Sequence, residues 1–493
     1  MKHNKVLFVF LGLVVLGYVV LRSWILDITY DEAWTLDGFV GAPVIDIVSY
    51  STPIANNHVI NTLLIKLLFS IGGESVFLSR LPNIFSCILY LFYSYRISIH
   101  FFNGIFRISL FVLLVTNSFL LEFFGLARGY GLALSFDIVS IYYLLAFNES
   151  KKWSPAYSCI IFASISVICS FSVIFHFIGV VIAINYLQFS STPWKPRFFR
   201  LMFGSLGLSA ILAGVLYLPL TRLIAADALW YGGKTGIYGD TLFSLVSCSL
   251  GDVANDEIVS IVLAGSVAIF LVVAMLSLAI GGRKDAAILE RTRSLLILTF
   301  VPMLAMIMAH HAFGTNYPID RTALFIIPTV SIAFVQFSSE LHLARPTTLA
   351  RSMTTLLATI SILIFTYNFN LTNTTIWFQD AHTRDILGKL DAIGQKSGVV
   401  QKLDADWPFR ASILYYTVRG CYPNVAFVED EPANLDISAA DYYLHLCRSL
   451  EKVGYFAEDP VLSYHRDTIM YFEREGILLL SNTPRPDREQ DHQ

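Results

Sequence analysis

Long apolar runs separated by short polar segments dominate the chain. A bilayer core about 30 Å thick is crossed by roughly 20 helical residues that each rise about 1.5 Å, and most of these runs are close to that length. The pattern therefore predicts about eleven membrane-spanning helices, at residues 5–26, 80–99, 105–123, 131–147, 156–171, 172–189, 200–219, 258–280, 295–310, 321–339 and 352–369.

The first run begins behind Lys2 and Lys5, which is typical of a cytoplasmic N-terminus. A cleaved signal peptide is the alternative, but no small-x-small cleavage site follows Arg22 and Trp24. The run is therefore predicted to be a retained first helix.

Residues 58–71 are apolar but too short to cross a bilayer, and they carry Asn61 and Lys66. Their length favours a helix lying in the membrane interface. If they do not span, the cytoplasmic loops hold about twice as many Lys and Arg as the outer loops, as the positive-inside rule requires; if they span, this bias reverses. Residues 27–79 are therefore predicted to form one long extracytoplasmic loop with interfacial helices.

The composition changes after residue 369. Charged residues return, 380–393 has the pattern of an amphipathic helix, and 399–403 and 411–418 are typical of short helices or strands. The predicted fold is thus an all-α polytopic membrane protein over 1–369, followed by a small extracytoplasmic α/β domain over 370–480. Residues 481–493, rich in Pro and charge, are predicted to be disordered. In an oxidising compartment Cys421 and Cys447 could form a disulfide.

Composition narrows the classes of function. The chain is 55% hydrophobic and 14% charged, with a mean hydropathy of +0.62, which excludes an ordinary soluble enzyme. A net charge of −3 gives no indication of a nucleic-acid partner. The six cysteines show no C-x-x-C spacing, and no phosphate-binding loop of the G-x-x-x-x-G-K-[ST] or G-x-G-x-x-G type occurs.

Two adjacent carboxylates, Asp31 and Glu32, follow directly after the first apolar run. On a helix neighbouring side chains point about 100° apart, so only one of the two can face a given reacting atom. The structural alternative is that both are solvated residues at a helix start, where carboxylates are favourable.

Other polar residues lie on the same predicted side of the membrane. Asn57 and His58 precede the interface helix. In one interpretation Asn57 caps this helix and His58 is a surface imidazole. In the other, His58 is a metal or hydrogen-bond ligand. Arg128 and Arg321 lie at membrane edges, where arginine either reaches lipid headgroups or offers a planar fork to a specific phosphate. Further candidates on that side are Tyr130, Tyr317, His310 and His311.

Three ionisable residues fall within or beside apolar runs, where an unpaired charge costs at least about 2.5 kcal/mol. Glu122 is predicted to pair with Arg128. Asp137 and His176 are predicted to make polar contacts between helices.

The order of several short segments resembles the multi-spanning glycosyltransferases of the GT-C superfamily, in particular the bacterial protein O-mannosyltransferase-like and aminoarabinose-transferase-like branch. The resemblance covers roughly the first 150 residues and, more faintly, a later segment. It is carried by Tyr30-Asp31-Glu32-Ala33, Asn57-His58, Phe77-Leu-Ser-Arg80-Leu-Pro82, Ala127-Arg128-Gly129-Tyr130 and Tyr317-Pro-Ile-Asp-Arg321 followed by Pro328. Asn56-Asn57-His58 departs from the family, which often has a Pro-Pro pair there, and the C-terminal domain matches no known pattern.

The resemblance implies an enzyme of the bacterial plasma membrane that transfers a sugar from a polyprenyl-phosphate donor to a lipid, polysaccharide or protein acceptor at the outer face. It implies that Asp31 is the catalytic carboxylate and that basic residues bind the lipid phosphate. We expect Asp31 to be the general base of an inverting displacement, with Glu32 supporting it and with Arg128 and Arg321 clamping the phosphate. The protein is expected to contact membrane lipid. Whether the reaction needs a divalent cation is left open by the resemblance. The substrate-binding candidates are Asn57, His58, Arg128, Tyr130, Tyr317 and Arg321.

Two other classes of function are weighed against this one. A transporter or lipid flippase would use Asp137, His176 and Glu122 along its pathway, but the two-fold internal repeat typical of transporters is not visible. An assembly protein for envelope polysaccharide export would use the C-terminal domain to bind partners.

Overall fold

The computed structural model describes residues 2–254, 257–280, 286–344, 348–428, 440–446 and 467–481. The chain forms two compact units. The membrane unit comprises Met1–Trp24 and Phe39–Asn370, and the C-terminal unit comprises Ile25–Gly38 and Leu371–Gln493. The second boundary lies within two residues of the predicted one.

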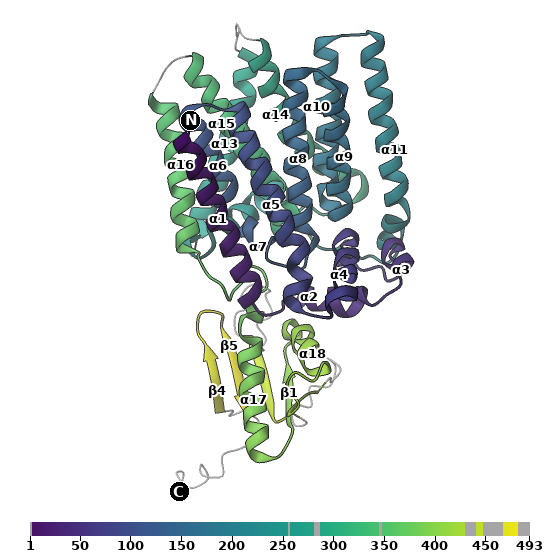
Figure 1. The fold of residues 1–493 in the computed structure, drawn as a ribbon, viewed down its shortest axis with the longest axis vertical. Helices are drawn as coiled ribbons and strands as arrows, with labels where there is room; N and C mark the ends of the chain where they lie inside the picture. Colours follow the sequence, from purple (N-terminus) through teal and green to yellow (C-terminus); the bar gives the residue numbers. More distant parts are fainter. Residues whose placement is uncertain are drawn as a thin grey trace. The chain divides into compact units, whose positions relative to one another are not determined.

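The membrane unit is a bundle of long helices that lie side by side, with the short helices α3 and α4 gathered at one end (Figure 1). Its helices are α1 Lys2–Ile25, α3 Val44–Ser49, α4 Val59–Gly72, α5 Val76–Phe101, α6 Gly104–Val115, α7 Ser118–Glu122, α8 Gly129–Ser150, α9 Trp153–Cys169, α10 Ile174–Ser191, α11 Pro196–Ala225, α12 Phe243–Leu250, α13 Glu257–Ile280, α14 Ala286–Phe313, α15 Ile326–Ala344 and α16 Thr348–Tyr367.

Each predicted apolar run falls on a helix of this bundle, and 7 of the described helices are long and apolar enough to cross a membrane. The prediction for 105–123 is wrong in part. Helix α6 ends at Val115, and the Asn117 side chain accepts the Leu120 N–H (2.9 Å) as the cap of a separate helix, α7. Helix α15 starts later than predicted because Asp320–Ala323 form a 3-10 turn.

The predicted interface helix is α4, with 14 residues. His58, not Asn57, occupies its N-cap position. The Asn57 amide donates to the Ile47 carbonyl (2.9 Å), and its oxygen accepts from the Thr62 hydroxyl (3.1 Å). Asn57 therefore ties α3 to α4, and the alternative in which it caps α4 is wrong.

Ionisable groups inside the bundle contact one another, as their cost in a membrane requires. His176 Nε2 on α10 lies 3.0 Å from Asp137 Oδ1 on α8, and both side chains are fully buried, which confirms the predicted polar contact between helices. Glu122 has a partner that the sequence did not indicate, because Arg22 on α1 lies 3.2 Å from its carboxylate.

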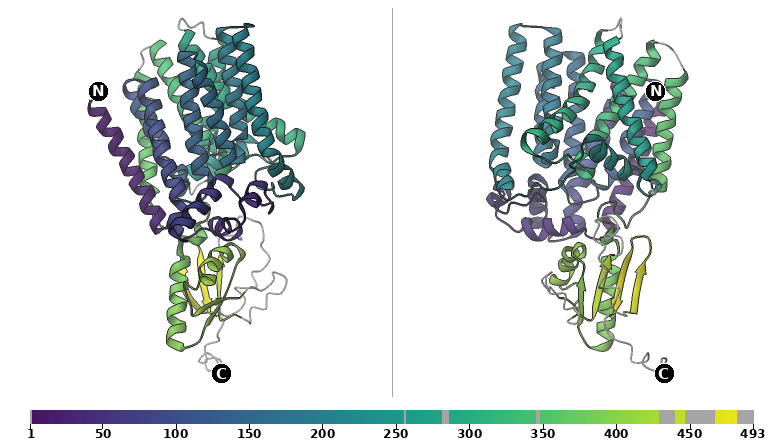
Figure 2. Two further views of the ribbon diagram at one scale, coloured as in Figure 1. Left: turned by 45° about the vertical axis from the view of Figure 1, so that its right-hand side comes forward. Right: turned by 180° about the vertical axis from the view of Figure 1, so that it is seen from behind.

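Helix α1 lies beside α16 in the bundle (Figure 2). The Tyr18 ring packs edge-on against the Phe365 ring at a centroid distance of 5.3 Å. The first and last spans of the bundle thus contact each other.

The C-terminal unit contains a five-stranded sheet in the order β2-β1-β3-β5-β4, in which β1 pairs in parallel with β2 and β3, while β5 pairs antiparallel with β3 and β4. Helix α17 runs along the sheet (Figure 1). The bounds are α17 Thr383–Ser397, β1 Gln401–Ala405, α18 Arg410–Val418, β2 Val425–Phe427, β3 Tyr442–Leu446, β4 Asp467–Phe472 and β5 Ile477–Ser481. The predicted small α/β domain is confirmed.

Two predictions for this domain concern residues outside the described part of the chain. Cys447 and residues 482–493 lie outside the described residues. The disulfide and the disordered tail therefore stay predictions.

The C-terminal unit differs from the predicted domain in one respect, because it also includes Ile25–Gly38. This segment contains helix α2, Tyr30–Thr35, and enters the π-helical turn Leu36–Val40. The segment belongs to this unit because it forms hydrogen bonds with α17 and with the preceding 3-10 turn, Phe378–His382. The first loop, predicted to be one element of the membrane domain, is therefore divided between the two units.

Candidate active site

The start of α2 is a capping box formed by Thr29 and Glu32. The Glu32 carboxylate accepts the Thr29 N–H (3.0 Å), and Thr29 Oγ1 accepts the Glu32 N–H (3.4 Å). Glu32 is fully buried. A capping box satisfies amides that would otherwise lack a partner at a helix start, so the Glu32 side chain has a structural task in this unit.

Asp31 is half-buried, in contrast to its neighbour. Its carbonyl accepts the Thr35 hydroxyl (2.9 Å), which adds a bond to the short helix. The two adjacent carboxylates thus have different surroundings.

His58, in the membrane unit, is buried between α4 and the end of α9. Its Nδ1 lies 3.0 Å from the Cys169 carbonyl oxygen, which can only accept, so Nδ1 carries the hydrogen. Burial, followed by the positive charge of Arg128, holds the His58 pKa well below its usual value. The ring is therefore neutral, and Nε2 is an acceptor that has no hydrogen-bond partner in the described part of the chain.

Arg128 occupies the N-cap position of α8 and is 2% exposed. Its Nη1 donates to the Asn56 carbonyl (3.1 Å), and its guanidinium lies 5.9 Å from the centre of the Tyr130 ring. The Tyr130 ring also packs edge-on against His58, 4.8 Å away. Arg128 is thus held in the protein interior, where it cannot reach out to bulk lipid headgroups as a snorkelling side chain does.

Gly129 is the reason that His58 can lie so close to α8. A Cβ at this position would lie 2.3 Å from the Cys169 carbonyl oxygen and 2.7 Å from the His58 Cβ. Both are closer than carbon contacts allow, and one of them involves backbone.

Gly129→Ala is therefore expected to destabilise the membrane unit by roughly 1–3 kcal/mol, the usual cost of overpacking. Thermal unfolding in detergent, compared with Gly207→Ala, measures the effect; Gly207 has nothing within 4 Å of its added Cβ. Equal melting temperatures for the two variants would contradict the close approach.

Arg321 lies in a second set of contacts, with Tyr231 and Asp320. Its Nη1 donates to the Tyr231 hydroxyl (2.7 Å), and its guanidinium stacks 4.0 Å from the centre of that ring. The Tyr231 hydroxyl donates in turn to Asp320, whose backbone has a positive φ of 37°. Such strain in a residue other than glycine is typical of functional sites.

Tyr317 joins two loops. Its N–H donates to the Gly233 carbonyl (2.8 Å), and its carbonyl accepts the Gly233 N–H (2.9 Å). The His310 ring stacks on it at 4.6 Å. Its backbone therefore holds residues 310–321 beside the loop that carries Tyr231.

The turn Asp320–Ala323, which carries Arg321, contacts the turn Phe171–Val173, which follows the Cys169 carbonyl beside His58. The positive charges of Arg128 and Arg321 both add to the effect of burial in lowering the His58 pKa. We call His58, Arg128, Tyr130, Tyr231 and Arg321 the arginine cluster. Two guanidinium groups in a poorly hydrated setting are suited to bind an anion such as a phosphate.

Sequence reasoning missed Tyr231 and Asp320. The signal for Tyr231 was the stretch Trp230-Tyr231-Gly232-Gly233 in a loop, where Gly232 permits the close approach to Asn316 and Tyr317. The contact with Arg321 could not be read from it, since it depends on how the two loops meet.

The described residues contain no group of three or more His, Cys, Asp and Glu side chains placed to hold a metal ion. The ring centres of His310 and His311 lie 5.3 Å apart, and His310 Nδ1 lies 2.7 Å from the Thr315 carbonyl oxygen.

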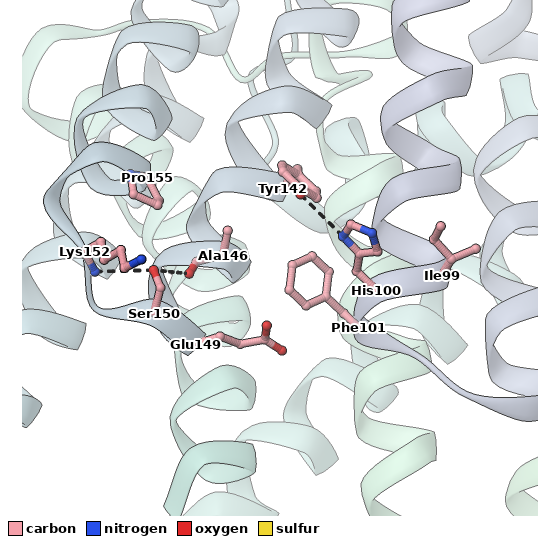
Figure 3. Close-up of a pocket in the computed structure, with 9 residues that line it drawn as sticks. All are labelled: Ile99, His100, Phe101, Tyr142, Ala146, Glu149, Ser150, Lys152 and Pro155. Carbon is pink, nitrogen blue, oxygen red and sulfur yellow. Dashed lines mark hydrogen bonds between the residues drawn. The ribbon is translucent and has the colours of Figure 1, made fainter.

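A cavity of about 650 Å³ lies elsewhere, where α5 and α8 end and α9 begins (Figure 3). The arginine cluster is at the other end of α8, which starts at Gly129. No predicted site residue lines this cavity; its walls include Ile99, His100, Phe101, Tyr142, Glu149 and Lys152.

Comparison with known proteins identifies the fold. Neither a scan against protein-family models nor a search of curated proteins finds a match. Among solved structures, ArnT from Cupriavidus metallidurans in the apo state aligns over 98% of both chains, with a TM-score of 0.50 and 9% identity. The chain has the ArnT fold. ArnT bound to undecaprenyl phosphate aligns over 98% of both chains, with a TM-score of 0.50 and 10% identity.

At 9% and 10% identity this similarity concerns the fold, and the resemblance to the GT-C superfamily stays a prediction from the sequence. The similarity does not separate the branches within it. A mannosyltransferase-like activity has no support from it.

Proposed function

We propose that this protein is a membrane glycosyltransferase that transfers a sugar from a polyprenyl-phosphate donor to an acceptor at the extracytoplasmic face, with inversion. The observation that carries the proposal is the arginine cluster. Arg128 lies by the Tyr130 ring that packs against His58, and the turn that carries Arg321 contacts the turn after Cys169, whose carbonyl lies beside His58. The ArnT fold supports it, since one of the matching structures has a polyprenyl phosphate bound. The predicted orientation, with a cytoplasmic N-terminus, belongs to the same proposal.

At the donor, the bond between the anomeric carbon and the phosphate oxygen breaks, and its electron pair stays on the oxygen. Polyprenyl phosphate leaves with an additional negative charge. Arg128 and Arg321 stabilise that charge, and such stabilisation in a water-poor site is typically the largest contribution to catalysis. The planar forks of the two side chains match the phosphate oxygens.

His58 has a different task from the arginines. Its free acceptor Nε2 repels a phosphate oxygen, which is also an acceptor, and accepts a hydrogen bond from a hydroxyl. We therefore assign His58 to a hydroxyl of the transferred sugar. Asn57, Tyr130 and Tyr317, which the sequence indicated as substrate-binding, support this cluster through their contacts with α3, His58 and Gly233.

At the acceptor, Asp31 removes the proton of the attacking hydroxyl while the new bond to the anomeric carbon forms. A carboxylate can do so only if it is accessible, and Asp31 is half-buried whereas Glu32 is fully buried in its capping box. Glu32 is thus assigned to holding α2 in shape. Chelator treatment followed by addition of Mn²⁺ or Mg²⁺ measures whether the reaction also uses a metal.

The purified protein in lipid nanodiscs, given a polyprenyl-phosphate sugar and candidate acceptors, tests the proposal. We expect release of free polyprenyl phosphate that depends on the acceptor, together with a glycosylated product of inverted configuration. Movement of the intact lipid-linked sugar between leaflets of a reconstituted vesicle, without any covalent change, is the result expected of a flippase and would overturn the proposal.

A further inference from the structure

The segment that carries Asp31 is part of the C-terminal unit, although it follows the first membrane span in the chain. The bonds that hold it come from residues more than 340 positions away in sequence. They fall on consecutive parts of the segment, from Ile25 to Tyr30, immediately before the carboxylate.

Asp380 holds the first residue of α2. Its Oδ2 accepts the Tyr30 N–H (2.7 Å), and its Oδ1 accepts the Ser412 hydroxyl (2.7 Å). The side chain is 1% exposed. Asp380 therefore satisfies one of the amides that α2 cannot satisfy internally, while Thr29 and Glu32 satisfy others.

Arg384, one turn further along, holds the residues before α2. Its Nε donates to the Asp27 carboxylate, which also accepts the Arg384 backbone N–H (2.9 Å), and its Nη2 donates to the Ile25 carbonyl. The Ile28 N–H donates to the Tyr416 hydroxyl (3.3 Å). Asp27 is 5% exposed, so its contact with Arg384 is screened by water less than a surface pair is.

We propose that Asp380 and Arg384 are positioning residues for Asp31, because they hold, within the C-terminal unit, the short helix on which it lies. We call these two residues the clasp. The inference rests on the proposed function, because it assumes that Asp31 is the base. It assigns the C-terminal domain a task in the reaction, whereas the sequence indicated only partner binding, as one alternative.

Positioning explains why so many bonds converge on so short a helix. Six residues are too few for a helix to be stable by itself in water. Without the clasp, α2 would sample other conformations, and a general base works only within hydrogen-bonding reach of the proton that it takes. A misplacement of about 1 Å can lower a rate about 100-fold.

The test uses the full-length protein with Asp380→Ala and Arg384→Met. Each is expected to lower kcat for polyprenyl phosphate release by about 10- to 100-fold, while the donor KM stays within about twofold. Hydrogen–deuterium exchange is expected to speed up in residues 25–38 and to stay unchanged in the β-strands. Lys389→Met is the matched control, since Lys389 is an exposed cation on the same helix, and it should behave as wild type.

Asp380→Asn keeps the inference testable if the alanine variant folds poorly. The asparagine oxygen can accept the Tyr30 N–H, and its NH₂ can donate to Ser412 Oγ, whose own hydrogen has the Phe409 carbonyl (2.9 Å) as acceptor. We expect this variant to keep kcat within about threefold of wild type.

The inference is overturned if Asp380→Ala and Arg384→Met keep the wild-type kcat, if exchange in residues 25–38 is unchanged, or if Asp380→Asn is as slow as Asp380→Ala. Failure of the proposed function has a different signature. An Asp31→Asn variant with wild-type kcat removes Asp31 as the base, while the exchange data still report whether the clasp holds α2.

Discussion

Asp31→Asn is expected to lower kcat by about 10²- to 10⁴-fold, the range that a positioned general base contributes. Asparagine has nearly the same shape as aspartate but cannot take a proton from the acceptor. The side chain is half-buried and its backbone bonds to Thr35 stay available, so the fold of α2 should not change. Steady-state release of polyprenyl phosphate gives kcat, and binding of the donor in the absence of acceptor should be unaffected.

Two neighbouring carboxylates serve as controls for this variant. Glu32→Gln should stay active, because glutamine also forms a capping box with threonine. Asp37→Asn removes a partly exposed carboxylate, 2.7 Å from Arg419, and should cost little. If Glu32→Gln lost as much activity as Asp31→Asn, the assignment of the base to Asp31 alone would be wrong.

The spans of the membrane unit could be predicted because a bilayer imposes a length and an apolar composition on every crossing helix. The break at Thr116 could not be predicted, because residues 105–123 are mostly apolar. One of the few polar residues there, Asn117, caps α7. That cap competes locally with helix continuation, and hydropathy does not measure it.

The candidate site could be predicted in part. The arginines and His58 were indicated by their positions at predicted membrane edges, and in the structure the elements that carry them contact one another. The division of roles between Asp31 and Glu32 could not be derived, because a capping box and a catalytic pair look alike before the Thr29 contacts are known. The clasp could not be predicted either, since Asp380 and Arg384 are separated by most of the chain from Tyr30 and Asp27, to which they bond, and no local pattern indicates these pairs.

Arg321→Met is expected to lower kcat/KM for the lipid-linked donor by about 10²- to 10³-fold, as the loss of one charge-stabilising group commonly does. Methionine keeps much of the stem's apolar packing against the Tyr231 ring but removes the guanidinium that donates to the Tyr231 hydroxyl. Arg321 is a cleaner test than Arg128, because Arg128 is almost fully buried and its loss would also disturb the Asn56 carbonyl.

The decisive readout is the pattern across substrates. Binding of polyprenyl phosphate alone should weaken in Arg321→Met, whereas the acceptor KM should stay unchanged, because the arginine cluster is assigned to the departing phosphate. Arg222→Met is the matched control: Arg222 bonds to the Ser49 carbonyl (2.8 Å) and is not part of the arginine cluster. If both variants bound polyprenyl phosphate like wild type while Arg321→Met lost acceptor affinity, Arg321 would belong to the acceptor. The donor phosphate would then need another cation.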